Sequence, residues 1–290
     1  MFKTRISGLA IALSLVLIPS IPSFVAAADE VEEVVAIGTR REARSVGDSP
    51  APVDIISGSD FTNQGAADLP DMIRTLVPSF NVNTQPISDA ATLIRPANLR
   101  GLPPDNMLVL VNGKRRHRGA VISFLGSGIS DGAQGPDISA IPSIALKQVE
   151  VLRDGAAAQY GSDAIAGIMN FVYKDNAEGT QIEIRSGEYA DGDGDMYRIA
   201  ANVGMPFTAN GFANVSIELQ ESDATSRSVQ RGDAQALYDG GNAAIWNYPN
   251  PAQVWGSPDV SDDVKLVANI GLELDTNKEF YLFGNYAERK

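Results

Sequence analysis

Residues 146–172 read LKQVEVLRDGAAAQYGSDAIAGIMNFV, and no other stretch of the chain is as informative about its fold. An alternating segment at 146–152 enters a Gly/Ala turn, a Tyr-Gly-Ser-Asp corner follows at 160–163, and a second apolar segment leaves it. Alternation with a period of two residues predicts a strand, and the glycines predict backbone angles or close approaches that other residues cannot adopt. The stretch therefore predicts two strands joined by a glycine-rich corner.

A helix is predicted upstream of this stretch, beginning after Asp68. Its apolar residues follow helical spacing: Leu69, Met72, Ile73 and Leu76. Asp68 can cap the first turn, Pro70 suits a position that needs no N–H donor, and Pro78 ends the helix.

Short strands accompany this helix. One starts at Val53, another covers 80–82, and a buried strand at 107–111 ends at Asn112-Gly113, a pair that tolerates the positive φ angles of a type I′ hairpin turn. Short strands with one or two helices predict an α+β domain over residues 50–175 rather than a wound βαβ sheet.

The first 28 residues are typical of a secretory signal peptide. Lys3 and Arg5 precede an apolar run at 6–18, and three alanines at 26–28 precede Asp29. The run is shorter than the roughly 20 apolar residues that a spanning helix needs. A buried N-terminal helix is the alternative interpretation.

Composition narrows the compartment and excludes several classes of protein. Removing residues 1–28 takes away two basic and no acidic residues, so the formal net charge changes from -13 to -15. An acidic exported chain is not a nucleic-acid binder, because phosphate attraction needs a basic surface. The chain has no cysteine, which excludes disulfides and cysteine-based metal sites. Periplasm and outer membrane both remain open on composition alone.

From residue 176 to 290 the pattern changes to long alternating segments, which predict antiparallel strands of the length that a transmembrane β-barrel uses. Their apolar residues recur at period two: Ile182 and Ile184; Tyr197, Ile199, Ala201 and Val203; Ala213, Val215, Ile217 and Leu219; Leu266, Ala268, Ile270, Leu272 and Leu274; Phe280, Leu282 and Tyr286. Short turns at 208–211 and 275–278 alternate with long connections at 186–195 and 223–263, as in barrels with tight periplasmic turns. A soluble β-sandwich also alternates and is the other interpretation.

Residues 29–49 have no sustained period and predict a mobile segment. Within it, Glu33, Val34, Val35, Ala36 and Ile37 form a short β-prone core. Such a core suits strand addition, in which backbone hydrogen bonds join a peptide to the sheet edge of a partner. An ordinary first strand of the domain is the alternative.

Together these residues resemble TonB-dependent outer-membrane receptors. Residues 33–37 resemble the TonB box, 68–77 the early plug helix, and 99–101 with 108–113 the core "-RG…VLVDG-" motif, although Asn112 stands where Asp is common. Residues 138–172 resemble the closing section of the plug domain. The resemblance implies an α+β plug domain followed by antiparallel strands of an incomplete transmembrane β-barrel, because five strands cannot close.

The function that the resemblance implies is energised uptake of a scarce extracellular small-molecule ligand, such as siderophore–iron, cobalamin or an oligosaccharide. Its partners would be TonB, with the energising complex of the inner membrane, and the lipid of the outer membrane of a Gram-negative bacterium. No cofactor is implied. The chain ends inside an apparent strand at Lys290, so we expect it to be an N-terminal fragment or a truncated product.

The resemblance also implies roles for individual residues. Candidates for the floor of the ligand site are Arg100, Asn106, Arg116, Arg118 and Phe124. Candidates for structural roles in the plug are Gly101, Arg153, Asp154, Gly155, Tyr160, Gly161 and Gly167, and we expect Arg153 and Asp154 to hold the plug to the barrel wall through buried ion pairs. For the basic cluster at 114–118, a solvated strand with some residues paired to carboxylates of the barrel wall is the alternative to a ligand site.

Neither a catalytic set nor a metal site is predicted. The single histidine, His117, has no histidine or cysteine partner for zinc, and neither a Gly-x-Ser-x-Gly elbow nor a phosphate-binding loop occurs. Asp191, Asp193 and Asp195 have the spacing of calcium ligands, but Met196 stands at the sixth loop position and Asn202 at the twelfth. We therefore expect a solvated acidic loop and a protein that is not an enzyme. A soluble periplasmic binding module built on a plug-like domain is the runner-up, and an exported hydrolase ranks below it.

Overall fold

The computed structural model describes residues 34–35, 44–45, 53–66, 68–82, 94–123, 128–242, 256–275 and 278–290. The predicted signal peptide lies outside these residues, as do Glu33, Ala36, Ile37 and Phe124. Among the described helices, none has the length and apolar character that crossing a bilayer requires.

A five-stranded mixed sheet forms the centre of the predicted α+β domain, which we call the plug-like domain. Its strand order is β3-β8-β9-β6-β7. The strands are β3 (Val53–Ser57), β6 (Met107–Val111), β7 (Lys114–Arg115), β8 (Leu146–Leu152) and β9 (Gly167–Tyr173). All neighbours are antiparallel except β6 and β9, which run parallel. The strands predicted at 53, 107–111 and on both sides of the glycine-rich corner are confirmed.

Short helices and a small second sheet accompany this sheet. The helices are α1 (Gly58–Thr62), α2 (Leu69–Leu76) and α4 (Ala157–Tyr160), with 3-10 turns η2 (Pro104–Asn106) and η3 (Ser143–Ala145). Strand β4 (Phe80–Val82) pairs with β5 (Ala97–Leu99), and β1 (Val34–Val35) pairs with β2 (Arg44–Ser45). Helix α5 (Gly232–Asp239) lies outside this domain, in the long connection after residue 222. Asp68 caps α2 as predicted, since its carboxylate accepts from the Asp71 N–H at 3.1 Å. Such a cap contributes about 1 kcal/mol.

The glycine-rich corner between β8 and β9 depends on Gly167. Its φ is +141°, and a Cβ at this position would lie 2.3 Å from the Leu152 carbonyl oxygen. Gly101 and Gly161 also have positive φ angles. Gly155 differs from the expectation: its φ is not in the left-handed region, and a Cβ there would meet its nearest neighbour, the Ile165 carbonyl oxygen, at an ordinary 3.5 Å.

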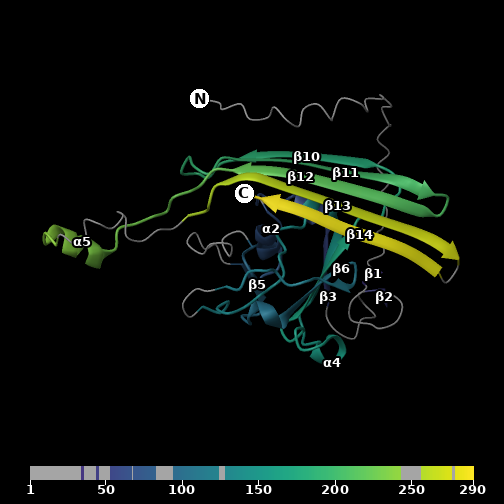
Figure 1. Cartoon of the computed structure of the whole chain (residues 1–290), viewed down its shortest axis with the longest axis horizontal. Helices are drawn as coiled ribbons and strands as arrows, with labels where there is room; N and C mark the ends of the chain where they lie inside the picture. Colours follow the sequence, from purple (N-terminus) through teal and green to yellow (C-terminus); the bar gives the residue numbers. More distant parts are fainter. Residues whose placement is uncertain are drawn as a thin grey trace. The chain divides into compact units, whose positions relative to one another are not determined.

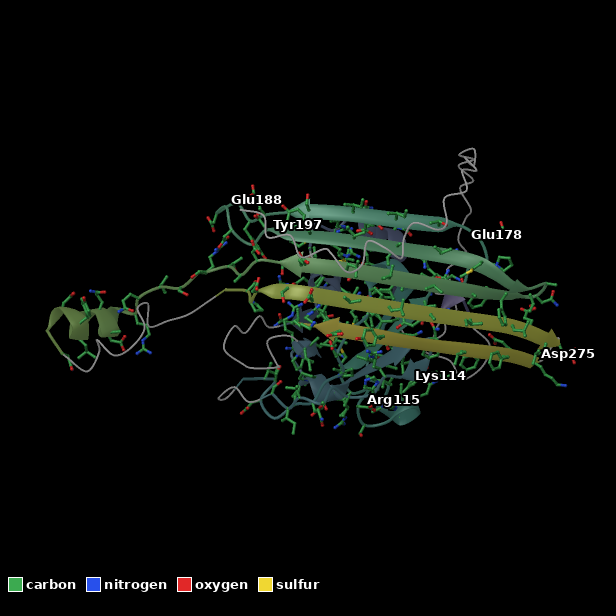
Figure 2. The ribbon with its side chains drawn as sticks, turned by 45° about the horizontal axis from the view of Figure 1, so that its top comes forward. Lys114, Arg115, Glu178, Glu188, Tyr197 and Asp275 are labelled. Atoms are coloured by element: carbon green, nitrogen blue, oxygen red, sulfur yellow. The ribbon has the colours of Figure 1, made fainter. Side chains whose placement is uncertain are left out.

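Five long antiparallel strands follow in chain order and form the second large sheet, the long sheet (Figure 1). They are β10 (Thr180–Gly187), β11 (Met196–Thr208), β12 (Gly211–Ser222), β13 (Val260–Asp275) and β14 (Lys278–Arg289). All five predicted segments and the short turn at 208–211 are confirmed; Thr276 and Asn277 of the other short turn lie outside the described residues, and Asp275 pairs with Lys278 on either side of them. The alternating connections place Glu178 and Asp275 at one end of the sheet, and Glu188 and Tyr197 at the other (Figure 2).

The two faces of the long sheet have inverted polarity. One face leaves large apolar side chains exposed: Ile182, Ile184, Tyr197, Ile199, Ile217, Leu266, Leu274, Phe280, Leu282 and Tyr286. The other face buries polar and charged side chains: Arg198, Asn202, Asn214, Ser216, Glu218, Gln220, Asp263, Lys265 and Asn269. A water-soluble sheet buries its apolar face instead, so this pattern favours the barrel-wall interpretation over the soluble β-sandwich.

Candidate functional site

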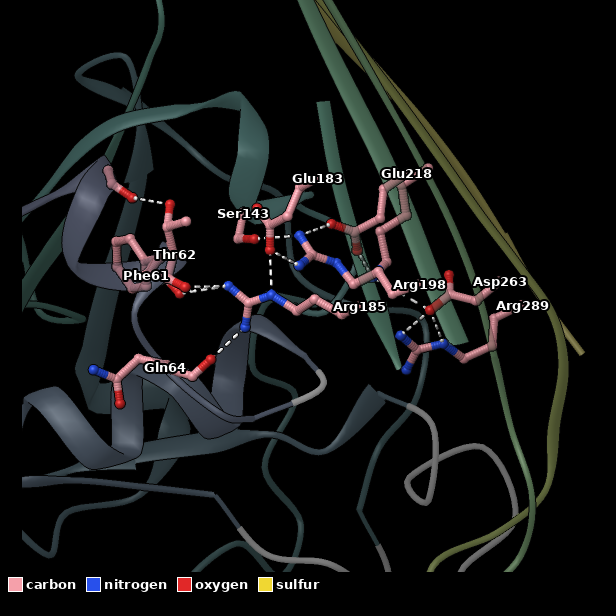
Figure 3. Close-up of polar contacts among 12 residues, drawn as sticks. Phe61, Thr62, Gln64, Ser143, Glu183, Arg185, Arg198, Glu218, Asp263 and Arg289 are labelled. Atoms are coloured by element: carbon pink, nitrogen blue, oxygen red, sulfur yellow. Dashed lines mark hydrogen bonds and ion pairs between the residues drawn. The ribbon is translucent and has the colours of Figure 1, made fainter. Parts of the chain in front are cut away.

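The polar face of the long sheet carries a chain of alternating charges at its contact with the plug-like domain (Figure 3). We call these seven side chains the ionic network: Glu183, Arg185, Arg198, Glu218, Lys265, Asp263 and Arg289. They come from all five strands, in the order of the strands. The hydrogen-bonded pairing of the strands brings together charged side chains that lie far apart in the sequence.

Each link of the ionic network joins a cation to a carboxylate. Arg198 contacts Glu183 at 2.8 Å and Glu218 at 2.7 Å. Lys265 contacts Glu218 at 2.7 Å and Asp263 at 3.3 Å, and the latter accepts from the Arg289 Nε at 3.0 Å. The side chains of Arg198 and Lys265 are each only 1% exposed. Charges this deeply buried need such pairing, because desolvation would otherwise cost several kcal/mol per ion.

Two arginines of the ionic network reach the plug-like domain. Arg185 donates from its two terminal nitrogens to the backbone carbonyls of Phe61 and Thr62, which end α1, and of Gln64 just beyond it (Figure 3). Arg198 donates to the Ser143 hydroxyl at 2.6 Å. The charged face of the sheet therefore holds the plug-like domain through arginine.

A second charged cluster lies at the start of α2 in the plug-like domain. Arg95, at a left-handed φ of 47°, forms ion pairs with Asp68 and Asp71. Burial raises the pKa of Asp68, but the charges of Arg95 and Arg289 and the Asp71 N–H outweigh it, so the net pKa is lowered. The pKa of Asp71 is raised, by burial and then by the neighbouring Asp68. One carboxylate of this pair thus stays charged to lower pH than the other.

Neutral amide groups form a separate set of contacts between the two parts. The Asn112 Nδ2 donates to the Asn269 Oδ1 at 3.2 Å, and the Asn269 Nδ2 donates to the Lys174 carbonyl at 3.0 Å. The Asn214 Nδ2 donates to the Asn176 Oδ1 at 2.9 Å. We call these the amide contacts. They join the hairpin β6–β7 and the end of the plug-like domain to strands β12 and β13.

The candidate ligand residues are not gathered into one site. Arg100 and Asn106 both contact the backbone of Ala166, through the Arg100 guanidinium at 3.5 Å and the Asn106 carbonyl at 2.8 Å. Arg116 donates to the Asn285 Oδ1 of β14 at 2.9 Å, while Arg118 is exposed. Phe124 lies outside the described residues. Arg116 therefore contacts the sheet, as the alternative interpretation of the basic cluster expects, though at an amide instead of a carboxylate.

The prediction that Arg153 forms a buried ion pair with the barrel wall is wrong. Arg153 pairs with Asp54 of β3 at 2.5 Å, inside the plug-like domain, and both side chains are nearly half exposed. Asp154 accepts from the N–H of Gly155. The side chains of the long sheet that bond the plug-like domain here are Arg185 and Arg198, through hydrogen bonds to backbone carbonyls and to the Ser143 hydroxyl, and no motif in the sequence indicated them. Their signal in the sequence was their place at polar positions of alternating strands.

The acidic connection before β11 is partly paired rather than simply solvated. Arg227 contacts Asp191 at 3.1 Å and Asp193 at 2.5 Å. The hydrogen bonds from Arg227 lower the pKa of Asp193. Within the described ranges, no group of three or more histidine, cysteine or acidic side chains is arranged to hold a metal ion.

The chain is similar to known proteins over the plug-like domain and beyond it. Residues 45–168 match the family described as the TonB-dependent receptor plug domain. The chain is 25% identical over 207 residues to the vitamin B12 transporter BtuB of Photobacterium profundum, covering 71% of this chain and 31% of that protein. It is 26% identical over 210 residues to the ferric enterobactin receptor of Pseudomonas aeruginosa, covering 70% and 27%. A third relative, the rhizobactin receptor of Rhizobium meliloti, is 26% identical over 266 residues, covering 91% and 31%. The chain spans about a third of the length of the curated relatives it matches.

Solved structures show the same fold. A mutant of the ferric enterobactin receptor from Pseudomonas aeruginosa, in complex with enterobactin, gives a TM-score of 0.59 at 20% identity, covering 82% of this chain and 33% of that one. The siderophore receptor PirA from Acinetobacter baumannii gives 0.57 at 19% identity, covering 82% and 31%. The likeness covers the mixed-sheet domain together with the strands that follow it.

Proposed function

We propose that the protein takes up a scarce extracellular ligand across the outer membrane, because residues 45–168 match the TonB-dependent receptor plug domain and antiparallel strands follow them. The observation that carries the proposal is the inverted polarity of the long sheet. Its exposed apolar face suits lipid, and its buried charged face is satisfied by the plug. We propose residues 50–175 as the plug, 176–290 as the first barrel strands, and 1–28 as the signal peptide.

The mechanism that we propose has no chemical step. Ligand binds from outside to plug residues that include Arg100, Asn106, Arg116, Arg118 and Phe124, because arginine suits carboxylate, phosphate or other anionic oxygen groups. Relatives carry names of receptors for cobalamin, enterobactin and rhizobactin, so a siderophore–iron complex, cobalamin or an oligosaccharide are the candidate ligands.

Energy would enter through the short strand Val34–Val35. In the structure it pairs with Arg44–Ser45 of the same chain, antiparallel. This pairing occupies backbone groups that a partner strand of TonB would use, so release of β1 from β2 would make the segment available for strand addition. TonB, energised from the inner membrane, then displaces the plug and lets the ligand pass.

Two measurements test the proposal. A barrel protein stays with the outer-membrane fraction after alkaline washing, whereas the runner-up, a soluble periplasmic module, is released by osmotic shock.

Purified protein should also bind the periplasmic domain of TonB, and Val34→Pro should abolish that binding, because proline removes an N–H donor from the strand. Release into the soluble fraction, or TonB binding unchanged by Val34→Pro, would contradict the proposal.

A further inference from the structure

Two chemically different groups of polar contacts join the plug to the long sheet at different places. Arg185 of the ionic network bonds the end of α1, in the early half of the plug. Arg198 bonds Ser143 of η3. The amide contacts hold Asn112, Lys174 and Asn176, at the β6–β7 hairpin and beyond β9. The contacts named in the two groups share no residue, and the contacts of Arg116 with Asn285 and of Tyr173 with Phe283 lie on the side of the amide contacts.

Arg185 adds a cationic cap to the end of α1, whose Phe61 carbonyl also accepts the backbone N–H groups of Asn63 and Gln64. The last carbonyls of a helix have no partner within the helix and carry partial negative charge. Here the guanidinium Nη2 lies 3.1 Å from the Phe61 carbonyl and 2.7 Å from the Thr62 carbonyl, and Nη1 bonds the Gln64 carbonyl. The helix has no basic residue in its own last turn. A residue of the barrel wall therefore supplies the cationic cap of a plug helix.

The rest of the ionic network fixes the orientation of this cap. The Arg185 Nε pairs with Glu183, and Glu183 also accepts from Arg198 at 2.8 Å. The Arg185 side chain is 15% exposed, and its fork is turned to the plug with every nitrogen engaged (Figure 3). A planar fork held in this way meets three carbonyls at once, which a lysine ammonium cannot do in the same geometry.

The place of α1 in the chain makes this cap significant. Helix α1 directly follows β3, and the Ser57 side chain caps its start. Strand β3 is an edge strand that pairs only with β8. Along the chain from its N-terminal side, β3 comes before α1. Among the described residues, α1 is the first element of the plug whose backbone is hydrogen-bonded to the barrel wall.

We propose that Arg185 is the positioning residue that seats the N-terminal part of the plug on the wall, independently of the amide contacts that seat its C-terminal part. Loss of Arg185 frees α1 while the β6–β7 hairpin stays docked. This role deepens the proposed function and rests on it for its use, since uptake needs the plug to leave the wall in a defined order. Its test requires neither ligand nor energy.

Amide hydrogen exchange of the purified protein in detergent distinguishes the two groups of contacts. Arg185→Gln should speed the exchange of amides in residues 58–66 at least tenfold, because α1 loses its cap, and leave residues 107–116 unchanged. Asn269→Ala should do the reverse, with faster exchange at 107–116 and none of the effect at 58–66. Arg231→Gln removes an equal charge from an exposed arginine that pairs with Asp233, and should change neither region.

Arg185→Lys keeps the charge but not the fork, and should give an intermediate rate at residues 58–66. It also replaces Arg185→Gln in the comparison if that variant does not accumulate. Exchange at 58–66 that stays at the wild-type rate in Arg185→Gln, or that rises equally over the whole plug, would overturn the role of Arg185. Failure of TonB binding with this local response intact would instead overturn the proposed function alone.

Discussion

Arg198 of β11 and Glu218 of β12 lie 2.7 Å apart, and their side chains are 1% and 3% exposed. Glu218 also accepts from Lys265 at 2.7 Å, so one carboxylate compensates two buried cations. A membrane wall that buries its charges inward depends on such sharing, because neither cation has water as an alternative partner.

Glu218→Gln should therefore be strongly destabilising, by about 3–5 kcal/mol, because it leaves Arg198 and Lys265 without their shared counter-charge. Chemical unfolding in lipid vesicles measures the loss. The double variant Arg198→Leu with Glu218→Leu should cost less than Glu218→Gln, since Glu183 keeps Arg185 and Lys265 keeps Asp263. Asp191→Asn is the control: this carboxylate is 72% exposed, and we expect a change below about 0.5 kcal/mol. Equal effects of Glu218→Gln and Asp191→Asn would contradict the account.

Gly167→Ala tests the corner between β8 and β9. A methyl group would lie 2.3 Å from the Leu152 carbonyl oxygen and 2.8 Å from the Leu99 side chain, at a φ of +141°. Backbone strain and overpacking together should cost about 3 kcal/mol or more. Gly155→Ala, which meets only an ordinary contact, should stay within about 1 kcal/mol. The two variants should separate clearly in thermal unfolding, and a Gly167→Ala protein as stable as Gly155→Ala would count against the geometry.

Much of this fold could be predicted from the sequence because its signals are local. The alternation at 182–184 and 197–203 needs only a period of two, and Asn112-Gly113 needs only the angles of a tight turn. The partners of Arg185 could not be predicted in this way. Its bond to the Gln64 carbonyl spans 121 positions, and depends on how the plug sits on the strand and not on any motif.

The same reason explains the misplaced expectation for Arg153. A motif shows which residue types occur together in the sequence, but it does not define which side chain each of them contacts. Arg153 pairs with Asp54 of β3 and not with the barrel wall. The contact of Arg116, which follows the Asn112-Gly113 turn, could not be predicted for the same reason. Arg116 contacts Asn285, a pairing over 169 positions that only the register of β14 can define.

Tyr173 gives the plug a dependence on alkaline pH. Burial raises the pKa of its hydroxyl to about 12, with a smaller opposing effect of Arg116. Below pH 10 both folded and unfolded chains keep the proton, so this part of the stability is fully present. Between pH 10 and about 12 the unfolded chain loses the proton first, and stability should fall by about 3 kcal/mol in total, at about 1.4 kcal/mol per pH unit.

Tyr173→Phe should remove this part of the pH dependence and keep the edge-to-face packing on Phe283, whose ring centre lies 6.2 Å away. Unfolding free energies of both proteins, measured from pH 9 upward, provide the comparison. Parallel losses in the two proteins would show that Tyr173 ionises as freely in the folded chain as in the unfolded one.

Asn112→Gly and Asn112→Ala separate the two roles of Asn112. Its φ of 47° favours Asn or Gly, and its side chain bonds both Asn269 and the Tyr173 N–H. Glycine keeps the backbone angle but loses the amide, whereas alanine loses both, so alanine should be the less stable by about 1 kcal/mol. Equal stabilities, measured by chemical unfolding, would mean that the turn angle costs nothing here.

Ile184→Arg addresses the lipid-facing interpretation directly. Ile184 is 75% exposed, so in a soluble sheet an arginine there should change the unfolding free energy by less than about 0.5 kcal/mol. On the lipid face of a barrel wall the same change should cost about 2–4 kcal/mol near the bilayer midplane. Glu188→Arg, just beyond the end of β10, is the matched control and should be nearly neutral in either case, because that position reaches water. Unfolding from vesicles gives both values, and the difference between them is the decisive quantity. If Ile184→Arg is as neutral as Glu188→Arg, the apolar face of the long sheet does not face lipid.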